Sequence, residues 1–140
     1  MPGQITLRII TPEAVVLDRT VSSVKFMALD GSMGVLPGHA PMVTALGPGE
    51  LVADGEGQSE HYFVSGGFAE VAGGTLRVVS DACERPSDID VERAGQAAER
   101  ARTRLKERRV GDAETFDLLR AEASLRRALM RQNLAGRRRT

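Results

Sequence analysis

The stretch YFVSGGFAEVAGGTLRVVS, residues 62–80, carries the strongest structural signal in this chain. Three short runs of strand-forming residues in it are separated only by glycine pairs. Gly73-Gly74 is a two-residue connection that tolerates positive φ, as β-hairpin turns require. The glycines of Ser65-Gly66-Gly67 predict a bulge or a close approach of two backbones. The stretch therefore predicts consecutive short strands.

The same period-two pattern extends upstream. Ile5, Leu7 and Ile9 occupy alternate positions in one run, and so do Val24, Phe26 and Ala28 in another. Other strand-forming runs are 43–46, 51–53, 62–65, 68–71 and 76–80. Many short strands without an intervening helix predict an antiparallel β-sandwich or flattened barrel.

Composition changes abruptly at Pro86. The 140 residues carry 19 basic and 19 acidic side chains, but residues 1–86 have 5 basic and 10 acidic ones, a net charge of −5. Residues 87–140 have 14 basic and 9 acidic side chains, a net charge of +5. All six prolines and 12 of the 15 glycines lie at or before Pro86. These shifts predict two domains, 1–86 and 87–140.

The second domain has helical periodicity. Ser87, with Asp90 three residues later, predicts a helix start, and Asp112 is the expected cap of a second helix. Each helix carries a stripe of small and apolar residues, namely Val91, Ala94, Ala98, Ala101 and Leu105, and then Leu118, Ala121, Leu125 and Ala128. Two such helices with a turn near Gly111 predict an antiparallel hairpin. Small residues bury little area, so this hairpin is expected to open easily.

Several classes of function are disfavoured by composition. With Cys83 as the single cysteine, the chain cannot form an internal disulfide or a multi-cysteine zinc site. His39 and His61 lack metal-ligand spacing, and we expect a loop histidine and a strand-face residue. No apolar run is long enough to span a membrane, and no signal peptide is evident, so a reducing, cytoplasmic-type compartment is expected. Scarce aromatic residues disfavour nucleic-acid binding, even with the basic run Arg137-Arg138-Arg139.

Four arginines are spaced to share helix faces. Arg93 and Arg100 are seven residues apart, and Arg127 and Arg131 are four apart. An antiparallel hairpin would bring all four toward its open end, where converging positive charges call for an anion or carboxylates. The alternative is a solvated helix face without a ligand.

Three motifs together resemble the epsilon subunit of F-type ATP synthases. They are Gly34-Val35-Leu36-Pro37-Gly38-His39-Ala40-Pro41, Val64-Ser65-Gly66-Gly67-Phe68-Ala69-Glu70-Val71 and Ile89-Asp90-Val91-Glu92-Arg93-Ala94. The resemblance implies a β-sandwich of about ten strands followed by an antiparallel two-helix hairpin. It implies a non-catalytic rotor subunit seated on the gamma subunit and the c-ring, peripheral to the cytoplasmic face of the bacterial plasma membrane. The helices of such subunits can extend along gamma into the catalytic alpha/beta hexamer and inhibit ATP hydrolysis.

The resemblance also implies particular sites. Regulatory ATP, with no metal or other cofactor, would be contacted by Glu84, Ile89, Asp90, Arg93, Ala94, Arg100, Arg127 and Arg131. Arginines would take the phosphates, and Asp90 the adenine amino group. A loop around residues 30–41 would face the rotor through Asp30, Ser32, Pro37, Gly38 and His39. Ser32 stands where many members carry an acid.

Two alternatives remain open at this point. One is a stand-alone enzyme with His39 or Cys83 as its reactive group. The other is a free-standing ATP-binding sensor outside any rotor.

Overall fold

A computed structural model describes residues 3–107 and 115–137. The chain divides into two compact units, Met1–Arg85 and Pro86–Thr140. The expected cap Asp112, the turn near Gly111 and the basic run 137–139 lie wholly or partly outside the described residues, so those predictions remain open.

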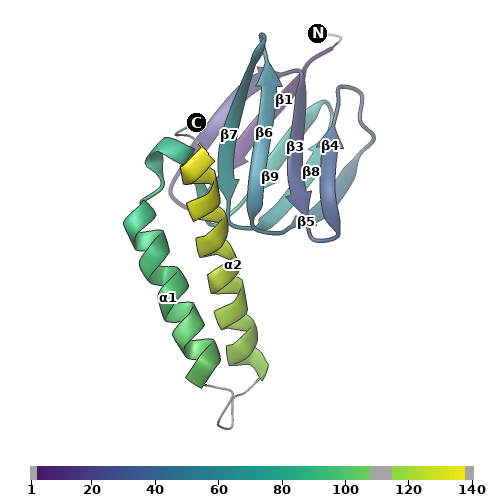
Figure 1. Ribbon diagram of the computed structural model, residues 1–140. Coiled ribbons are helices and arrows are strands. Elements are labelled where there is room, and N and C mark those ends of the chain that lie inside the picture. The colour runs from purple at the N-terminus through teal and green to yellow at the C-terminus, as the bar shows by residue number, and fades with distance from the viewer. Residues whose placement is uncertain (1–2, 108–114, 138–140) are drawn as a thin grey trace. The chain divides into compact units, whose positions relative to one another are not determined.

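The first unit is a β-sandwich of ten strands, as predicted (Figure 1). The strands are β1 (Ile5–Ile10), β2 (Val15–Val21), β3 (Ser23–Ala28), β4 (Gly31–Val35), β5 (Met42–Leu46), β6 (Gly49–Gly55), β7 (Gln58–Val64), β8 (Gly67–Ala72), β9 (Thr75–Val79) and β10 (Cys83–Glu84).

The strands form two layers joined at one corner. One layer has the order β4-β3-β6-β7-β10 and the other β5-β8-β9-β1-β2, and the single pair Ala28↔Leu46 links β3 to β5. One pair of strands departs from the expected antiparallel arrangement, because β1 pairs with β9 in parallel. The direction of β9 is set by its hairpin with β8, and it meets β1 far away in sequence.

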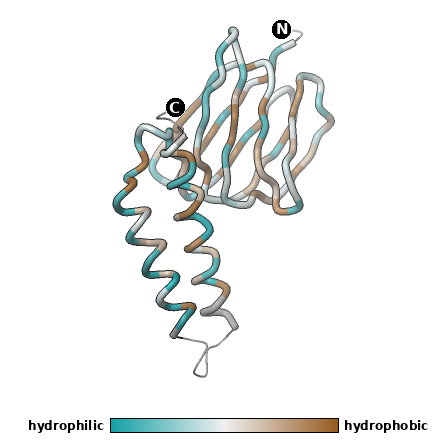
Figure 2. Tube along the Cα trace, in the orientation of Figure 1, coloured by the Kyte–Doolittle hydropathy of each residue, from teal (hydrophilic) through white to brown (hydrophobic). Residues whose placement is uncertain are grey.

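The core lies between the layers and follows the period-two pattern. Ile5, Leu7 and Ile9 of β1 are buried, and so are Val24, Phe26 and Ala28 of β3. More exposed residues alternate with them along each strand, and Figure 2 shows hydrophobic stretches interrupted by hydrophilic ones along the strands. The inward faces predicted for these two strands are therefore confirmed.

Glycines at two turns are required by geometry. Gly73 and Gly74 have φ of 56° and 77° and connect the pair Ala72↔Thr75, which confirms the predicted hairpin. Gly67 has φ of 113°, and a Cβ there would clash with the carbonyl oxygen of Val79. The close backbone approach predicted for this segment is confirmed.

The second unit contains a 3-10 turn and two helices, namely η1 (Pro86–Asp88), α1 (Val91–Glu107) and α2 (Thr115–Arg137). The predicted helix start at Ser87 is wrong, because Ser87 lies within η1. Asp90 is the cap instead, since its Oδ1 accepts a hydrogen bond from the backbone N–H of Arg93 at 3.0 Å.

Helices α1 and α2 pack side by side and antiparallel (Figure 1). The seam is built mainly from buried alanines, Ala94, Ala98 and Ala101 on α1 and Ala121 and Ala128 on α2. Val91 was expected in this stripe but is 45% exposed, because it is the first residue of α1. The approach is close enough that a Cβ on Gly95 would stand 3.4 Å from Gln132 Nε2. A seam of such small side chains buries little apolar area.

Candidate functional site

A shallow hollow on α1 gathers three of the predicted ligand residues. It has a volume of about 410 Å³ and is lined by Asp90, Glu92, Arg93, Gln96 and Arg100. Arg93 and Arg100 are seven residues apart, so they emerge on the same flank of the alanine stripe, and both are exposed. Two guanidinium groups at one hollow can bind an anion bearing several oxygens.

Asp90 lines this hollow and also has a structural role. One of its carboxylate oxygens caps α1, which fixes the position of the side chain at the helix start. A substitution that removes the cap therefore weakens the helix independently of any ligand.

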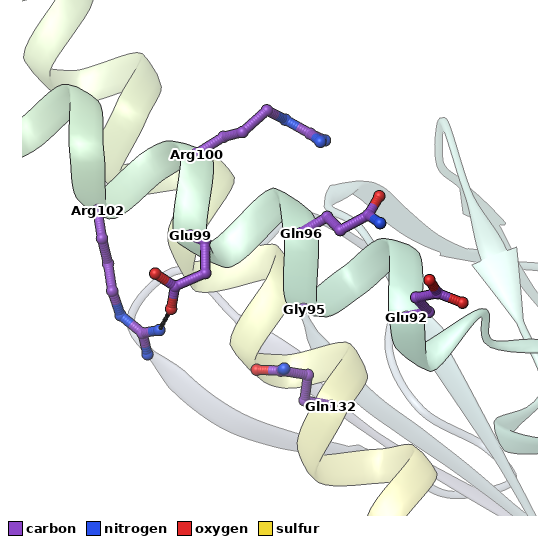
Figure 3. A pocket seen from close by; sticks show the side chains of 7 residues that line it. All are labelled: Glu92, Gly95, Gln96, Glu99, Arg100, Arg102 and Gln132. Carbon is purple, nitrogen blue, oxygen red and sulfur yellow. Dashed lines mark hydrogen bonds and ion pairs between the residues drawn. The ribbon is translucent and has the colours of Figure 1, made fainter.

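A second hollow lies across the two helices (Figure 3). Its volume is about 610 Å³, and it is lined by Gly95 of α1 and Gln132 of α2, whose Nε2 would lie 3.4 Å from a Cβ on Gly95. Glu99 and Arg102 point toward each other there and form an ion pair at 2.6 Å. This pair is exposed, so it contributes little to stability.

The other predicted ATP residues are distributed differently. Ile89 and Ala94 are buried, so they offer a ligand backbone groups rather than side-chain surface. Arg127 and Arg131 lie on α2, are half-buried and line neither of these two hollows. Glu84 lies in β10 and belongs to the sandwich unit. The convergence of four arginines remains a prediction.

The predicted rotor-contact residues do not lie in one loop. Asp30 is in the tight turn between β3 and β4, whereas Ser32 is within β4, where it pairs with Met27. Pro37, Gly38 and His39 follow the far end of that strand. The expectation of a single loop is wrong because residues 31–35 form a continuous ladder with β3.

The two histidines occupy the kinds of position expected from sequence. His39 is in a loop, where its backbone N–H donates to the Leu36 carbonyl at 3.1 Å and its ring Nδ1 lies 2.7 Å from the Ala40 carbonyl oxygen. His61 is on an exposed strand face, with Nδ1 3.3 Å from Glu50 Oε2.

Exposed apolar side chains mark surfaces that the motifs did not reveal. Leu29 and Leu36, at the two ends of β4, are 69% and 64% exposed. A row of apolar residues, each paired with the next across neighbouring strands, also crosses the outer face of the β5-β8-β9-β1-β2 layer. Its members are Ala45, Phe68, Val79, Ile10 and Val15. The three central members of this row, Phe68, Val79 and Ile10, border a hollow of about 340 Å³. The alternation within each strand indicates which residues face outward, but only the register between strands shows that these apolar residues form one row.

The surroundings of Cys83 do not favour a reactive thiol. Burial raises the pKa of the Cys83 thiol to about 11, and the nearby Glu84 carboxylate acts in the same direction. A thiol held protonated is the opposite of an activated nucleophile. Within residues 3–107 and 115–137, no group of three or more His, Cys, Asp or Glu side chains could hold a metal ion.

The fold and surfaces define a class of protein, a β-sandwich with exposed apolar side chains followed by a pair of helices with a hollow lined by two arginines and two acidic residues. Two family models divide the chain within one residue of the boundary between the two units. The ATP synthase delta/epsilon chain β-sandwich domain matches residues 4–86, and the long α-helix domain of that chain matches residues 87–136. The chain belongs to the ATP synthase delta/epsilon chain family, and the resemblance carried by the three motifs is confirmed.

Relatives extend over nearly the whole chain. The ATP synthase epsilon chain of Nitratidesulfovibrio vulgaris is 40% identical over 136 residues, covering 97% of this chain and 98% of that one. The epsilon chain of Moorella thermoacetica is 45% identical over 135 residues, covering 96% and 98%. In a solved Euglena gracilis mitochondrial ATP synthase (OSCP, F1 and c-ring), a chain aligns with a TM-score of 0.77 at 28% identity, covering 92% of this chain and 79% of that one.

Neither described helix has the length and apolar character needed to cross a bilayer.

Proposed function

We propose that this chain is the non-catalytic epsilon subunit of a bacterial F-type ATP synthase, seated in the central stalk. The observation that carries this proposal is the family match, which covers both units in order. The related Euglena chain comes from an assembly that contains F1 and a c-ring. The subunit would sit peripherally, on the cytoplasmic face of the plasma membrane, through its rotor partners.

The sandwich supplies surfaces suited to those partners. The outer apolar row from Ala45 to Val15 offers a strip for the gamma subunit, because contiguous exposed apolar side chains mark protein contacts. The turn with Leu29 and Asp30 offers one apolar and one acidic group to the c-ring. Ser32 lies one residue beyond this turn, and Pro37, Gly38 and His39 would meet a partner at the opposite end of β4.

The helical unit would act as a regulatory switch. ATP bound to the packed hairpin would place its phosphates near Arg93 and Arg100 and its adenine near Asp90, with Arg127, Arg131 and Glu84 as further contacts. The shared hollow of Asp90, Arg93 and Arg100 supports this assignment. The separated helices, which together carry the net charge of +5 of residues 87–140, would enter the catalytic hexamer and inhibit hydrolysis.

The energies are compatible with such a switch. A ligand that binds only the packed form stabilises it by about 2.7 kcal/mol at a hundredfold excess over Kd. Apart from Leu134, the buried side chains in the described parts of α1 and α2 are alanines, which bury little apolar area, so a term of this size is large enough to matter.

Reconstitution tests the regulatory role. In a Cys83→Ser background, Glu99→Cys on α1 and Leu129→Cys on α2 place two thiols at exposed positions for a short cross-linker. ATP synthase depleted of its epsilon subunit should be inhibited by the unlinked chain and not by the cross-linked one. Equal inhibition by both forms would contradict a role for hairpin opening, and failure of either form to bind would contradict the stalk assignment.

Calorimetry of the isolated full chain tests the nucleotide assignment. Arg93→Ala and Arg127→Ala should each weaken ATP binding, and Asp90→Ser should weaken it while keeping a helix cap. Arg104→Ala is the matched control, since Arg104 is an exposed arginine of α1 outside the hollow. Equal affinity in all four variants would remove these residues from the site.

A further inference from the structure

The sandwich unit ends in a short strand that follows a hydrogen-bonded anchor, since the backbone N–H of Ser65 donates to the Ala82 carbonyl and that of Ala82 donates to Ser65 Oγ, each at 3.0 Å. Strand β10 has only two residues, Cys83 and Glu84, which pair with Val64 and Phe63 of β7. Arg85 is the last residue of this unit. Two ladder positions alone would hold this end of the chain poorly, because a ladder frays at its ends.

Arg85 adds a side-chain contact beyond the ladder. Its guanidinium carbon lies 5.8 Å from the centroid of the Tyr62 ring, within the range of a cation–π contact. Tyr62 belongs to β7, the strand that β10 pairs with, and its side chain is 1% exposed. Arg85 is itself exposed, so burial does not fix the aliphatic part of its side chain. The ring is therefore the anchor that orients it.

Tyr62 is in turn fixed by a contact that joins the two layers. Its hydroxyl donates a hydrogen bond to Glu60 Oε2, and Glu60 Oε1 lies 2.6 Å from Nη1 of Arg19 on β2. Strand β2 is the outermost strand of the other layer. The charge of Arg85 also acts on Glu60, since it contributes to lowering the pKa of that carboxyl, after the Tyr62 hydrogen bond and Arg19. Arg19, Glu60, Tyr62 and Arg85 thus form one connected group, which we call the Arg85 clamp.

We propose that the Arg85 clamp holds β10 on the sandwich and so fixes Arg85 as the point from which the helical unit pivots. This inference rests on the proposed function, because a pivot matters only if the helices move. Arg85 is a positioning residue in this scheme. Without it, β10 would peel from β7 and the pivot would retreat toward Ala82.

Cys83 provides a built-in reporter, because the only thiol of the chain lies in β10 itself. It packs against the core and is only partly exposed, so opening of β10 should raise the rate at which a thiol reagent reacts with it. At low reagent concentration the labelling rate follows the population of the open form. Loss of a cation–π contact of this exposed kind should raise that population about twofold to fivefold.

The labelling experiment uses the full chain at constant pH. Arg85→Ala should accelerate labelling of Cys83 about twofold to fivefold, whereas Arg85→Lys should restore most of the protection because an ammonium group also binds an aromatic face. Arg77→Ala, which removes an exposed arginine from β9, should label like the wild type. The thermal midpoint of the sandwich should stay within a few degrees in all three variants.

The sign of the change separates the clamp from simple electrostatics. The positive charge of Arg85 favours the Cys83 thiolate, so removing that charge without opening β10 would slow labelling. Slower or unchanged labelling in Arg85→Ala would therefore overturn the proposal. Faster labelling in a chain that shows no response to ATP would support the clamp and count against the nucleotide switch, so the two ideas fail separately.

Discussion

Replacing Ala98 by leucine should shift the hairpin away from its packed form. Ala98 is 1% exposed in the seam between α1 and α2, so a leucine there has no room without displacing α2. Overpacking of this kind costs about 1–3 kcal/mol, while alanine and leucine differ little in helix propensity. A cost of about 2 kcal/mol corresponds to a roughly thirtyfold smaller ratio of packed to separated helices.

The smaller fraction of packed hairpin should change the response to ATP. If ATP binds only the packed form, its apparent Kd rises as the packed fraction falls, up to roughly thirtyfold. Energy transfer between dyes at Glu99→Cys and Leu129→Cys, in the Cys83→Ser background, follows the separation of the helices. The ATP concentration that half-maximally packs Ala98→Leu should exceed that of the parent by this factor.

Thr103→Leu is the matched control. It adds a leucine to the exposed face of α1, away from the seam, and should leave the ATP midpoint unchanged. An unchanged midpoint in Ala98→Leu, or an equal shift in Thr103→Leu, would refute the reasoning that the alanine seam sets the equilibrium.

Three further outcomes are expected. In urea titrations, Gly67→Ala should lower the free energy of unfolding by about 3 kcal/mol or more, because residue 67 has φ 113° and its new Cβ would clash with the Val79 carbonyl. Gly73→Ala should lower it by only about 1–2 kcal/mol, because residue 73 has φ 56° and open space around its Cβ position. Asp90→Ala should cost α1 about 0.5–2 kcal/mol, and Asp90→Ser little of that, when helix melting is followed by circular dichroism. Folding raises the pKa of Cys83 from 9.0 to about 11 and that of Tyr62 from 10.0 to about 12. Because the unfolded chain loses these protons at lower pH than the folded chain, the free energy of unfolding should fall between about pH 9 and pH 12. In Tyr62→Phe only the Cys83 contribution remains, so the urea midpoint should stop falling near pH 11.

Much of the sandwich was predictable from local pattern. Gly73-Gly74 and the alternation in residues 5–9 and 24–28 each encode structure within a few residues, and all three predictions are confirmed. Strand β4 was missed as a strand because Gly31 and Gly34 mask its pattern, and its partner β3 supplies the ladder. Strand β10 is too short to have a period at all.

The helical site was predictable only in part. Periodicity placed Arg93 and Arg100 on one face, and they share a hollow with Asp90. Capping chemistry did not distinguish Ser87 from Asp90, since both are good caps and the local backbone decides between them. The apolar row from Ala45 to Val15 depends on register across five strands, including a parallel pair, which no local pattern specifies.

Small-angle X-ray scattering of the unlabelled wild-type chain at increasing ATP concentrations tests the central claim most directly. If ATP closes a hairpin that otherwise opens, the radius of gyration should fall along one saturable curve, and Arg93→Ala should require more ATP. A radius that stays constant from zero to millimolar ATP would contradict the account.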